Sequence, residues 1–366
     1  MRTLRTSKLR KQFKPHADNG FFGPGSVTWK VWSYPAPALV GFQRAVVVEE
    51  LDPHLVQSVE DSGGVRSRPA TRYDRTLHYF ALVAFGDTAT TAKAADILVK
   101  VHSKGIGYDP VTGREYDAND PDSQLWIQVT GWHSILKSYQ MFGGPKLTDA
   151  EIDQYWAECA RAAELQTIDP ADVPRSAAEV RAYYEKWRPD LKGTPLAQDM
   201  ADFILTPGRS FPPGLPKWRR ATMLPVGYLV KWGTVSSYPA HIKELLGVRQ
   251  PRILDLIAKV TLTAGFKLAY RFPVLSVELL KLLSPSTVDV AAPILLGIPA
   301  ENQMTMTPRE AQKLYGYDEP AKAHLELRAK QHERVFGLGE APSDEGIIES
   351  QEVIGTTDVN RIGQLA

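Results

Sequence analysis

The chain has 366 residues, of which 43% are hydrophobic and 23% charged, so it has the apolar material for one large or two modest globular domains. Its formal net charge of +1 gives no general attraction to nucleic acid, and we expect no nucleic-acid partner. The single cysteine, Cys159, excludes an intramolecular disulfide and a multi-cysteine metal site, in keeping with a reducing compartment. Its aromatic and alanine neighbours on a helix predict a buried structural thiol.

The first 19 residues form a basic arm. Six lysines and arginines fall within residues 1–16, with no acidic residue and no following apolar segment, so no secretory signal is visible. No apolar run reaches the roughly 18 residues that a spanning helix needs. We therefore expect a cytoplasmic protein with a solvated arm. The alternative is that the arm is attracted to an anionic membrane surface, which would make the protein peripherally membrane-bound.

Long amphipathic helices dominate residues 20–336, and no alternating strand pattern or internal repeat is evident. This pattern predicts an all-α fold with a single large helical domain. Thr148-x-x-Glu151 and Ser176-x-x-Glu179 are typical capping boxes, and Asp87 and Asp122 are candidate N-caps. Proline-rich breaks at 207–216 and 285–299 are expected to separate helical sections.

The composition changes at residue 337 to glycine, serine and acidic residues, which predicts a disordered tail over 337–366. The tail ends in a short apolar patch, 360–366. A frayed terminus is the favoured interpretation, and docking of this patch into a partner's groove, as in bacterial encapsulin cargo tails, is the alternative.

The segment 253–272 repeats a polar residue every four positions on an otherwise apolar helix, and a second apolar helix follows at 274–283. One interpretation is a core helix with a solvated edge. The other is an interfacial helix that lies among lipid headgroups, which would again imply peripheral membrane contact.

His102 ends a predicted helix over 87–104. Lysines and Asp96 occupy the face that must meet water, whereas Thr91, Ala95, Leu98 and His102 follow the opposite face at helical spacing. His102 is therefore predicted to point inward. A structural histidine that complements the helix dipole is the simpler explanation, and ligation of a metal or haem is the functional one.

Arg72, Arg75, Thr76 and Tyr79 lie on one face of the preceding helix, which continues into a strongly apolar stretch. A guanidinium cannot lose its charge on burial, so an anionic partner is implied. Acidic side chains such as Asp74 or Glu60 are the ordinary candidates, and propionates or an oxygen-derived anion are the functional ones.

A third helix, 123–141, carries Trp126, Trp132, His133 and Tyr139 along one broad face. Aromatic residues at this spacing are usually core, but they also suit the wall of an apolar cofactor or lipid pocket. For His133 a core or surface position is favoured over a binding role. Phosphate loops, HExxH, GxSxG and CxxC are absent from the sequence, which argues against a hydrolase or a nicotinamide enzyme.

With these motifs in order, the chain resembles the MpaB-type oxygenases, the family that includes latex clearing proteins. The similarity covers about residues 20–191, with a weaker echo at 238–247. Its motifs are Gly23-Pro24-Gly25-Ser26-Val27-Thr28-Trp29, Arg72-Tyr73-Asp74-Arg75-Thr76, Phe85-Gly86, Val101-His102 and Tyr116–Pro121 leading into Leu125-Trp126.

The resemblance implies an all-helical fold around haem b, with His102 as the proximal iron ligand and therefore the metal-binding residue. It places Arg72, Arg75 and Thr76 on the distal side as catalytic residues. Arg72 and Trp126 are expected to contact the cofactor as well. The chain departs from the family pattern after the ligand, where His102-Ser103-Lys104 replaces the usual His-x-x-Val-Arg-Gly, and Gln128 and Asp52 stand where many relatives have histidine.

Two functions follow. The first is a haem b-dependent oxygenase that acts on an apolar, prenyl-like or unsaturated substrate, with Glu49, Glu50 and Glu60 as candidates for an acidic base. The second is a non-catalytic helical protein that binds haem or a lipid, either in solution or at a membrane surface.

Overall fold

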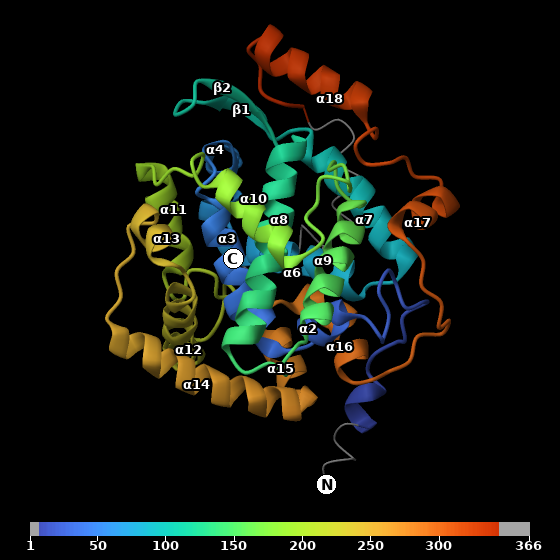
Figure 1. The fold of residues 1–366 in the computed structure, drawn as a ribbon, viewed down its shortest axis with the longest axis vertical. Coiled ribbons are helices and arrows are strands. Elements are labelled where there is room, and N and C mark those ends of the chain that lie inside the picture. Colours follow the sequence, from blue (N-terminus) through green and yellow to red (C-terminus); the bar gives the residue numbers. More distant parts are fainter. Residues whose placement is uncertain (1–6, 344–366) are drawn as a thin grey trace.

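The computed structural model describes residues 7–343, and this part of the chain is almost entirely helical, as the sequence predicts (Figure 1). The first half contains α2 (Val27–Trp32), the π-helix η1 (Pro37–Gly41), α3 (Phe42–Glu49), α4 (Pro53–Asp61), α5 (Gly64–Ser67), α6 (Pro69–Phe85), α7 (Thr88–His102), α8 (Pro121–Met141) and α9 (Asp149–Ala163). The second half contains α10 (Ala177–Trp187), α11 (Pro195–Leu205), α12 (Lys217–Ser236), α13 (Ala240–Leu245), α14 (Arg252–Arg271), α15 (Pro273–Leu283), α16 (Pro285–Leu295), α17 (Pro308–Tyr315), α18 (Leu325–His332) and the π-helix η2 (Glu333–Gly337).

A small antiparallel hairpin follows α7, where the sequence had indicated no strand. Its strands are β1 (Ile106–Asp109) and β2 (Arg114–Asp117), with Ile106 paired to Asp117. Each strand has four residues, which is too short to show a recognisable alternation of apolar and polar side chains. Gly113 takes a positive φ of 70° in the turn, a conformation that favours glycine.

The core is organised around α8, which runs through the middle of the molecule (Figure 1). Both of its sides are covered, so residues such as Trp126, Val129, Trp132 and Tyr139 are at most 1% exposed. Helix α3 and η1 pack along it on one side, and α9 packs along it on another. A helix enclosed in this way positions side chains with little freedom, and for this reason it suits a site.

The predicted helix starts are largely confirmed. Asp87 caps α7 through the amide of Thr90, and Thr148 with Glu151 forms a complete capping box. Ser176 caps α10, but Glu179 accepts a bond from the amide of Arg175 instead of returning to the cap. Asp122 was wrong as a cap, because Asp120 accepts the hydrogen bond from Ser123 N and α8 begins at Pro121.

The stretch 285–299 was predicted as a break, yet most of it is helix α16. Pro285 occupies the first helical position, where its missing amide hydrogen costs nothing. Pro293 lies inside the helix near its end. The stretch 207–216, in contrast, separates α11 from α12 as expected.

The N-terminal segment is docked on the helical body from residue 7 onward, which corrects the prediction of a free arm for that part. Leu9 is 7% exposed and packs with Val277, Val288 and Leu296. The carboxylate of Asp18 accepts bonds from the amide and hydroxyl of Thr88, at 2.9 and 2.6 Å. Residues 1–6 lie outside the described part of the chain.

The C-terminal segment is also ordered further than predicted. Residues 338–343 turn back on α18, where the amide of Ser343 donates to Gln331 at 2.8 Å and Glu340 pairs with Arg334 at 2.9 Å. The predicted boundary at 337 was therefore early. The rest of the predicted tail and the proposed docking patch at 360–366 lie outside the described residues.

Helix α14 lies at the edge of the molecule (Figure 1) and exposes an apolar face made of Ile253, Leu256, Ile257, Val260 and Leu268. Only Ala258, Leu262 and Phe266 are buried on this helix. The interpretation as a core helix with one solvated edge is therefore wrong. Within residues 7–343, none of the helices combines the length and apolarity needed to cross a bilayer.

Candidate functional site

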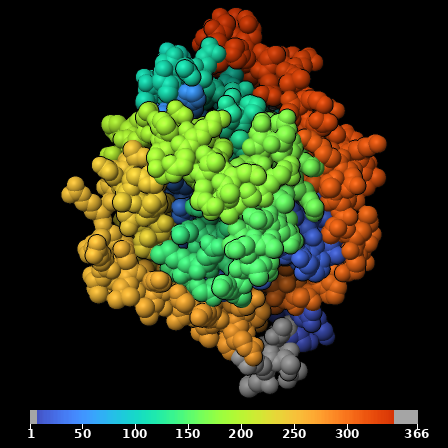
Figure 2. Space-filling view, viewed as in Figure 1, coloured from blue at the N-terminus to red at the C-terminus, as the bar shows by residue number. Residues whose placement is uncertain are grey.

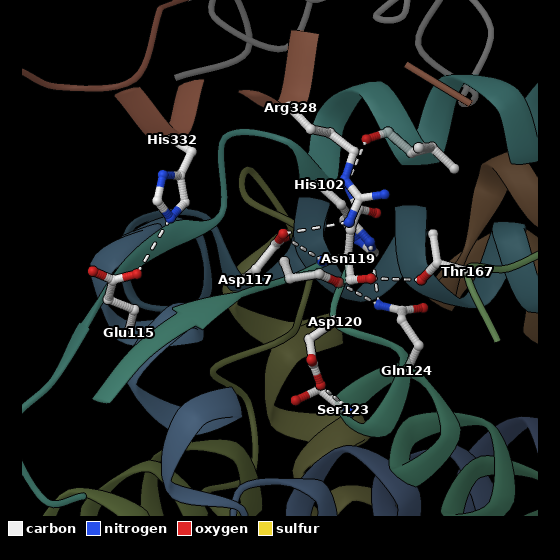
Figure 3. Close-up of polar contacts among 12 residues, drawn as sticks. His102, Glu115, Asp117, Asn119, Asp120, Ser123, Gln124, Thr167, Arg328 and His332 are labelled. Carbon is white, nitrogen blue, oxygen red and sulfur yellow. Dashed lines mark hydrogen bonds and ion pairs between the residues drawn. The ribbon is translucent and has the colours of Figure 1, made fainter. Parts of the chain in front are cut away.

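His102 is the last residue of α7 and lies against the start of α8. Its Nδ1 is 3.4 Å from Nε2 of Gln124, and that amide also donates to the carbonyl of Ala118 at 2.6 Å. Asn119 fixes the intervening loop by donating to Val99 O at 3.0 Å, and its own carbonyl accepts from Thr167. Figure 3 shows His102, Asn119 and Gln124 gathered from these different elements.

The imidazole of His102 is held neutral. Burial and the nearby positive charge of Arg72 lower its pKa to about 4. The side chain is half-buried, and its Nε2 makes no hydrogen bond or ion pair with any residue in 7–343. A neutral ring with one nitrogen free is the form of histidine that coordinates metals.

Arg72 on α6 is partly accessible to solvent, and desolvation by the protein around it lowers the pKa of its guanidinium. Within the described residues, Arg72 forms no ion pair or side-chain hydrogen bond. Thr76, one turn along α6, donates its hydroxyl to the carbonyl of Arg72 at 2.9 Å.

The acids near Arg72 differ from the ordinary candidates named from the sequence. Glu60 is engaged by Nε of Arg66 at 2.7 and 3.0 Å. Asp74 accepts bonds from the hydroxyls of Ser284 and Ser286 at 2.7 and 2.8 Å. The carboxyls that interact electrostatically with Arg72 are instead Glu49 and Glu50 at the end of α3.

Glu49 and Glu50 are carboxyls with strongly raised pKa values. Burial raises the pKa of Glu49 to about 8, although a hydrogen bond from Thr130, at 3.4 Å, and Arg72 oppose the rise. Burial and, to a smaller extent, the neighbouring Glu49 raise the pKa of Glu50 well above its ordinary value. Glu49 therefore holds a proton at neutral pH.

The remaining predicted residues occupy different surroundings. Arg75 is half-buried on α6, where burial and the charges of Arg68 and Arg72 lower its pKa. Trp126 is fully buried, stacks on Trp187 with ring centroids 5.3 Å apart, and donates to the carbonyl of Glu49 at 3.3 Å. Its packing role is evident, and its contact with a cofactor stays a prediction. Cys159 is buried, as predicted.

Sequence reasoning assigned no role to two residues of this region, Gln124 and Arg44. Gln124 reaches His102 only because the fold brings the start of α8 to the end of α7. His133 is half-buried, in keeping with the favoured core position, and its Nδ1 lies 3.4 Å from Nη1 of Arg44.

These residues fit a haem site. His102 offers a neutral nitrogen without a protein partner, and Arg72 presents an accessible, desolvated guanidinium near the same imidazole. Within residues 7–343, three or more His, Cys, Asp or Glu side chains nowhere gather into a group that could hold a metal ion. A single imidazole with surrounding cations matches a metal whose other ligands come from a porphyrin.

Comparison with known proteins decides the family. Residues 29–267, more than half of the chain, match the family model described as "ER-bound oxygenase mpaB/B'/Rubber oxygenase, catalytic domain". The chain belongs to this family. The family is one of oxygenases, and the matched range contains α6, α7 and α8 and thus the whole candidate site. Neither the curated proteins nor the solved structures contain a match to the chain.

Proposed function

We propose that the protein is a haem b-dependent oxygenase that acts on an apolar, unsaturated or prenyl-like substrate. The observation that carries the proposal is the neutral imidazole of His102, whose Nε2 has no hydrogen-bond partner within residues 7–343, beside the positive charge of Arg72 on the preceding helix. Family membership supplies the oxygenase class, and these two side chains supply the reason for haem.

His102 would hold the iron through Nε2, and its Nδ1 side would be oriented by Gln124. Bound haem supplies the oxygen chemistry that protein side chains lack. Arg72 would hold negative charge that develops on the distal side, because its charge persists in a desolvated space. Thr76 lies one turn away and would orient a bound polar group, with Arg75 adding positive charge beside them.

Glu49 is the better candidate for moving a proton. Its pKa of about 8 lies near neutral pH, where a general acid or base is most effective. Thr130 fixes the carboxyl by donating to it at 3.4 Å. Glu60 is excluded from this role by its ion pair with Arg66. Glu50, with one carboxyl oxygen buried and without a hydrogen-bond partner, is the second candidate.

An apolar groove beside α6 supports the substrate class. It lies between α6, η1, α15 and α16, and its walls are mostly aliphatic and aromatic side chains. Tyr73 and Leu77 line it from α6, whereas Arg72 and Thr76 do not. The groove therefore supports an apolar ligand next to α6.

The test is the absorption spectrum of protein expressed with ample haem, compared with His102→Ala. We expect a Soret band from histidine-bound haem in the parent protein and its loss in the variant. His241→Ala, which removes a half-buried imidazole from α13, is the control and should keep the band. Full haem content in His102→Ala would refute the ligand assignment.

Oxygen consumption separates the oxygenase from the alternative, a non-catalytic protein that binds haem or a lipid. The haem-loaded protein should consume oxygen in the presence of a prenyl-like alkene, and Arg72→Met should slow this consumption while haem stays bound. Haem binding without oxygen uptake for any apolar alkene would favour the non-catalytic function.

We also propose that the exposed face of α14 rests on a membrane surface. Its five large apolar side chains are 41–61% exposed, and Arg252, Lys259, Lys267 and Arg271 flank them in the same helix. Apolar side chains bordered by cations are typical of interfacial helices on anionic lipid.

Flotation with phosphatidylserine vesicles tests this attachment. The parent protein should float with the vesicles, and Leu256→Glu combined with Val260→Glu should abolish flotation. Leu314→Glu is the matched control, because Leu314 is 63% exposed on α17, away from the α14 face. Equal flotation of all three proteins would contradict the proposal.

A further inference from the structure

Arg44 is a buried cation without an anionic partner. It is 4% exposed in the middle of α3, and burial lowers its pKa. Its Nη1 donates to the hydroxyl of Ser134 at 2.6 Å and lies 3.4 Å from Nδ1 of His133. Its Nε is buried without a hydrogen-bond partner. Across residues 7–343, no carboxylate reaches ion-pair distance of this guanidinium, which is a costly arrangement for a permanent charge.

His133 offers a second donor at the same place. A guanidinium can only donate, so the Nδ1 of His133 facing Arg44 must accept, and the proton of the neutral ring then lies on Nε2. Burial and the charges of Arg44 and Lys137 keep the pKa of this imidazole well below its ordinary value, so the ring stays neutral. Its Nε2 has no hydrogen-bond partner in the described part of the chain.

Tyr184 on α10 brings a third donor. Its ring centroid is 4.9 Å from that of His133, and its hydroxyl oxygen is buried without a hydrogen-bond partner. Arg44 and the hydroxyl are close enough to affect each other's pKa. Donor groups from α3, α8 and α10 therefore gather here without a carboxylate among them.

The nearest acid does not complete the cluster. Glu49 lies five residues along α3, but its carboxyl accepts from Thr130 and interacts with Arg72. Since burial raises its pKa to about 8, it stays protonated near neutral pH and brings no negative charge. The cluster therefore retains an excess positive charge.

Only the edge of the cluster is accessible. His133 and Tyr184 are half-buried as whole side chains, whereas the Tyr184 hydroxyl and Arg44 Nε lie beneath the surface. Figure 2 shows this face of the molecule hollowed between the yellow-green and gold segments, with blue atoms of the N-terminal part at the floor. Glu49 lies about one helical turn from Arg44 along α3, and Thr130 lies about one turn from His133 along α8. The contact between Glu49 and Thr130 therefore connects the cluster with the candidate site.

We propose that Arg44, His133 and Tyr184 form a binding site for a carboxylate. A carboxylate presents two oxygens, which match a guanidinium with a free Nε–H and two neutral donors beside it. The group has two possible sources, the acidic end of an apolar ligand or a propionate of haem. The site itself depends on its own contacts and does not need the haem assignment.

The experiment measures oleate and methyl oleate binding to the full-length protein. Tyr184→Phe removes only the hydroxyl, Arg44→Met replaces the cation by an apolar chain of similar length, and Lys137→Met removes a neighbouring exposed cation as the control. Oleate should bind the parent protein more tightly than its ester does. Tyr184→Phe and Arg44→Met should weaken oleate binding about tenfold or more without affecting the ester, and Lys137→Met should leave both unchanged.

A parallel titration with haem and haem dimethyl ester distinguishes the sources. If Tyr184→Phe loses affinity only for haem, the site binds a propionate. If it loses affinity only for oleate, the site binds the acidic end of an apolar ligand. If Tyr184→Phe, which is the variant least able to disturb folding, binds both carboxylates as the parent does, the proposal is overturned. Oleate binding by a parent protein that takes up no haem would refute the proposed function and leave this site standing.

Discussion

Arg72 and His102 lie on successive helices and share one electrostatic environment. The guanidinium adds to burial in lowering the pKa of the imidazole to about 4, and the imidazole stays neutral beside it. The imidazole therefore carries no charge across the physiological pH range. The two properties come from different helices. Arg72 on α6 carries the permanent charge, and His102 on α7 provides the neutral nitrogen.

Gln124 is expected to orient His102. Gln124→Leu keeps the side-chain size but removes the amide that contacts His102 Nδ1 and the carbonyl of Ala118. Loss of such a supporting contact typically lowers affinity for a bound metal about 10- to 100-fold, and haem titration should show a fall of this order. Gln128→Leu is the matched control, since Gln128 donates to Cys159 O one turn along α8. An equal loss of haem affinity in Gln124→Leu and Gln128→Leu would mean that the effect comes from packing of α8 in general.

Glu49→Gln should change how stability depends on pH. The folded pKa of Glu49 is about 8, above the ordinary value of 4.5, so the folded protein holds a proton that the unfolded chain releases. Its contribution to stability is full below pH 4.5 and is lost as pH rises toward 8. Denaturant unfolding should show the parent protein losing stability relative to the variant over this range, by at most about 1.4 kcal/mol per pH unit. If the free energy of unfolding depends on pH in the same way for the parent protein and for Glu49→Gln, the raised pKa of Glu49 is contradicted.

The pKa of His102 predicts the opposite trend at lower pH. Its folded value of about 4 lies below the ordinary 6.5, so the unfolded chain binds a proton that the folded protein refuses. Stability from this group is full above pH 6.5 and falls as pH drops toward 4. His102→Phe should flatten this part of the curve in denaturant unfolding. A parent protein as stable at pH 4 as at pH 7 relative to the variant would show that the ring is not desolvated.

Gly41 sets the distance between η1 and α8. A methyl group there would lie 2.5 Å from Ser138 Oγ and 3.2 Å from the backbone Cα of Ile135. Gly41→Ala should therefore push η1 and the adjoining α3 away from α8, at a cost of about 1–3 kcal/mol in the free energy of unfolding. Gly265→Ala is the control, because a methyl group at Gly265 would meet nothing within 4 Å. An unchanged denaturation midpoint for Gly41→Ala would show that the contact can relax.

Arg328 is expected to hold α18 over the hairpin and the loop before α8. Its Nη2 lies 3.4 Å from Asp117, and Figure 3 shows Arg328 above the loop that carries Asn119. Arg328→Gln should speed amide exchange at β2 and at the end of α7, with less than about 1 kcal/mol lost in global stability, since the pair is partly exposed. Lys322→Gln, which breaks the exposed pair with Glu319, should leave this exchange unchanged. Exchange that is equally slow in both variants would refute a covering role.

The sequence alone determined the helical class, the α7 start at Asp87 and the placing of His102 on an inward face, because these depend on periodicity and capping within a few residues. The same reasoning placed Arg72 and Thr76 on one face of α6 and recognised the family. Local patterns could not reveal the hairpin, since four-residue strands carry too little alternation. They could not reveal the docking of residues 7–19 either, because its contacts lie far along the chain, at Thr88 and in α15 and α16.

Only the tertiary structure decided which acidic residues lie near Arg72. It also decided that Arg44 is a buried cation with no carboxylate beside it. Asp74 and Glu60 are close to Arg72 in the sequence, yet they are taken by serines of α16 and by Arg66, while Glu49 and Glu50 approach from α3. Desolvation is likewise a property of surrounding helices and not of the residue itself. The raised pKa of Glu49 and the buried, unpaired Arg44 therefore follow from the packing of α3 against α8, which no spacing within one helix encodes.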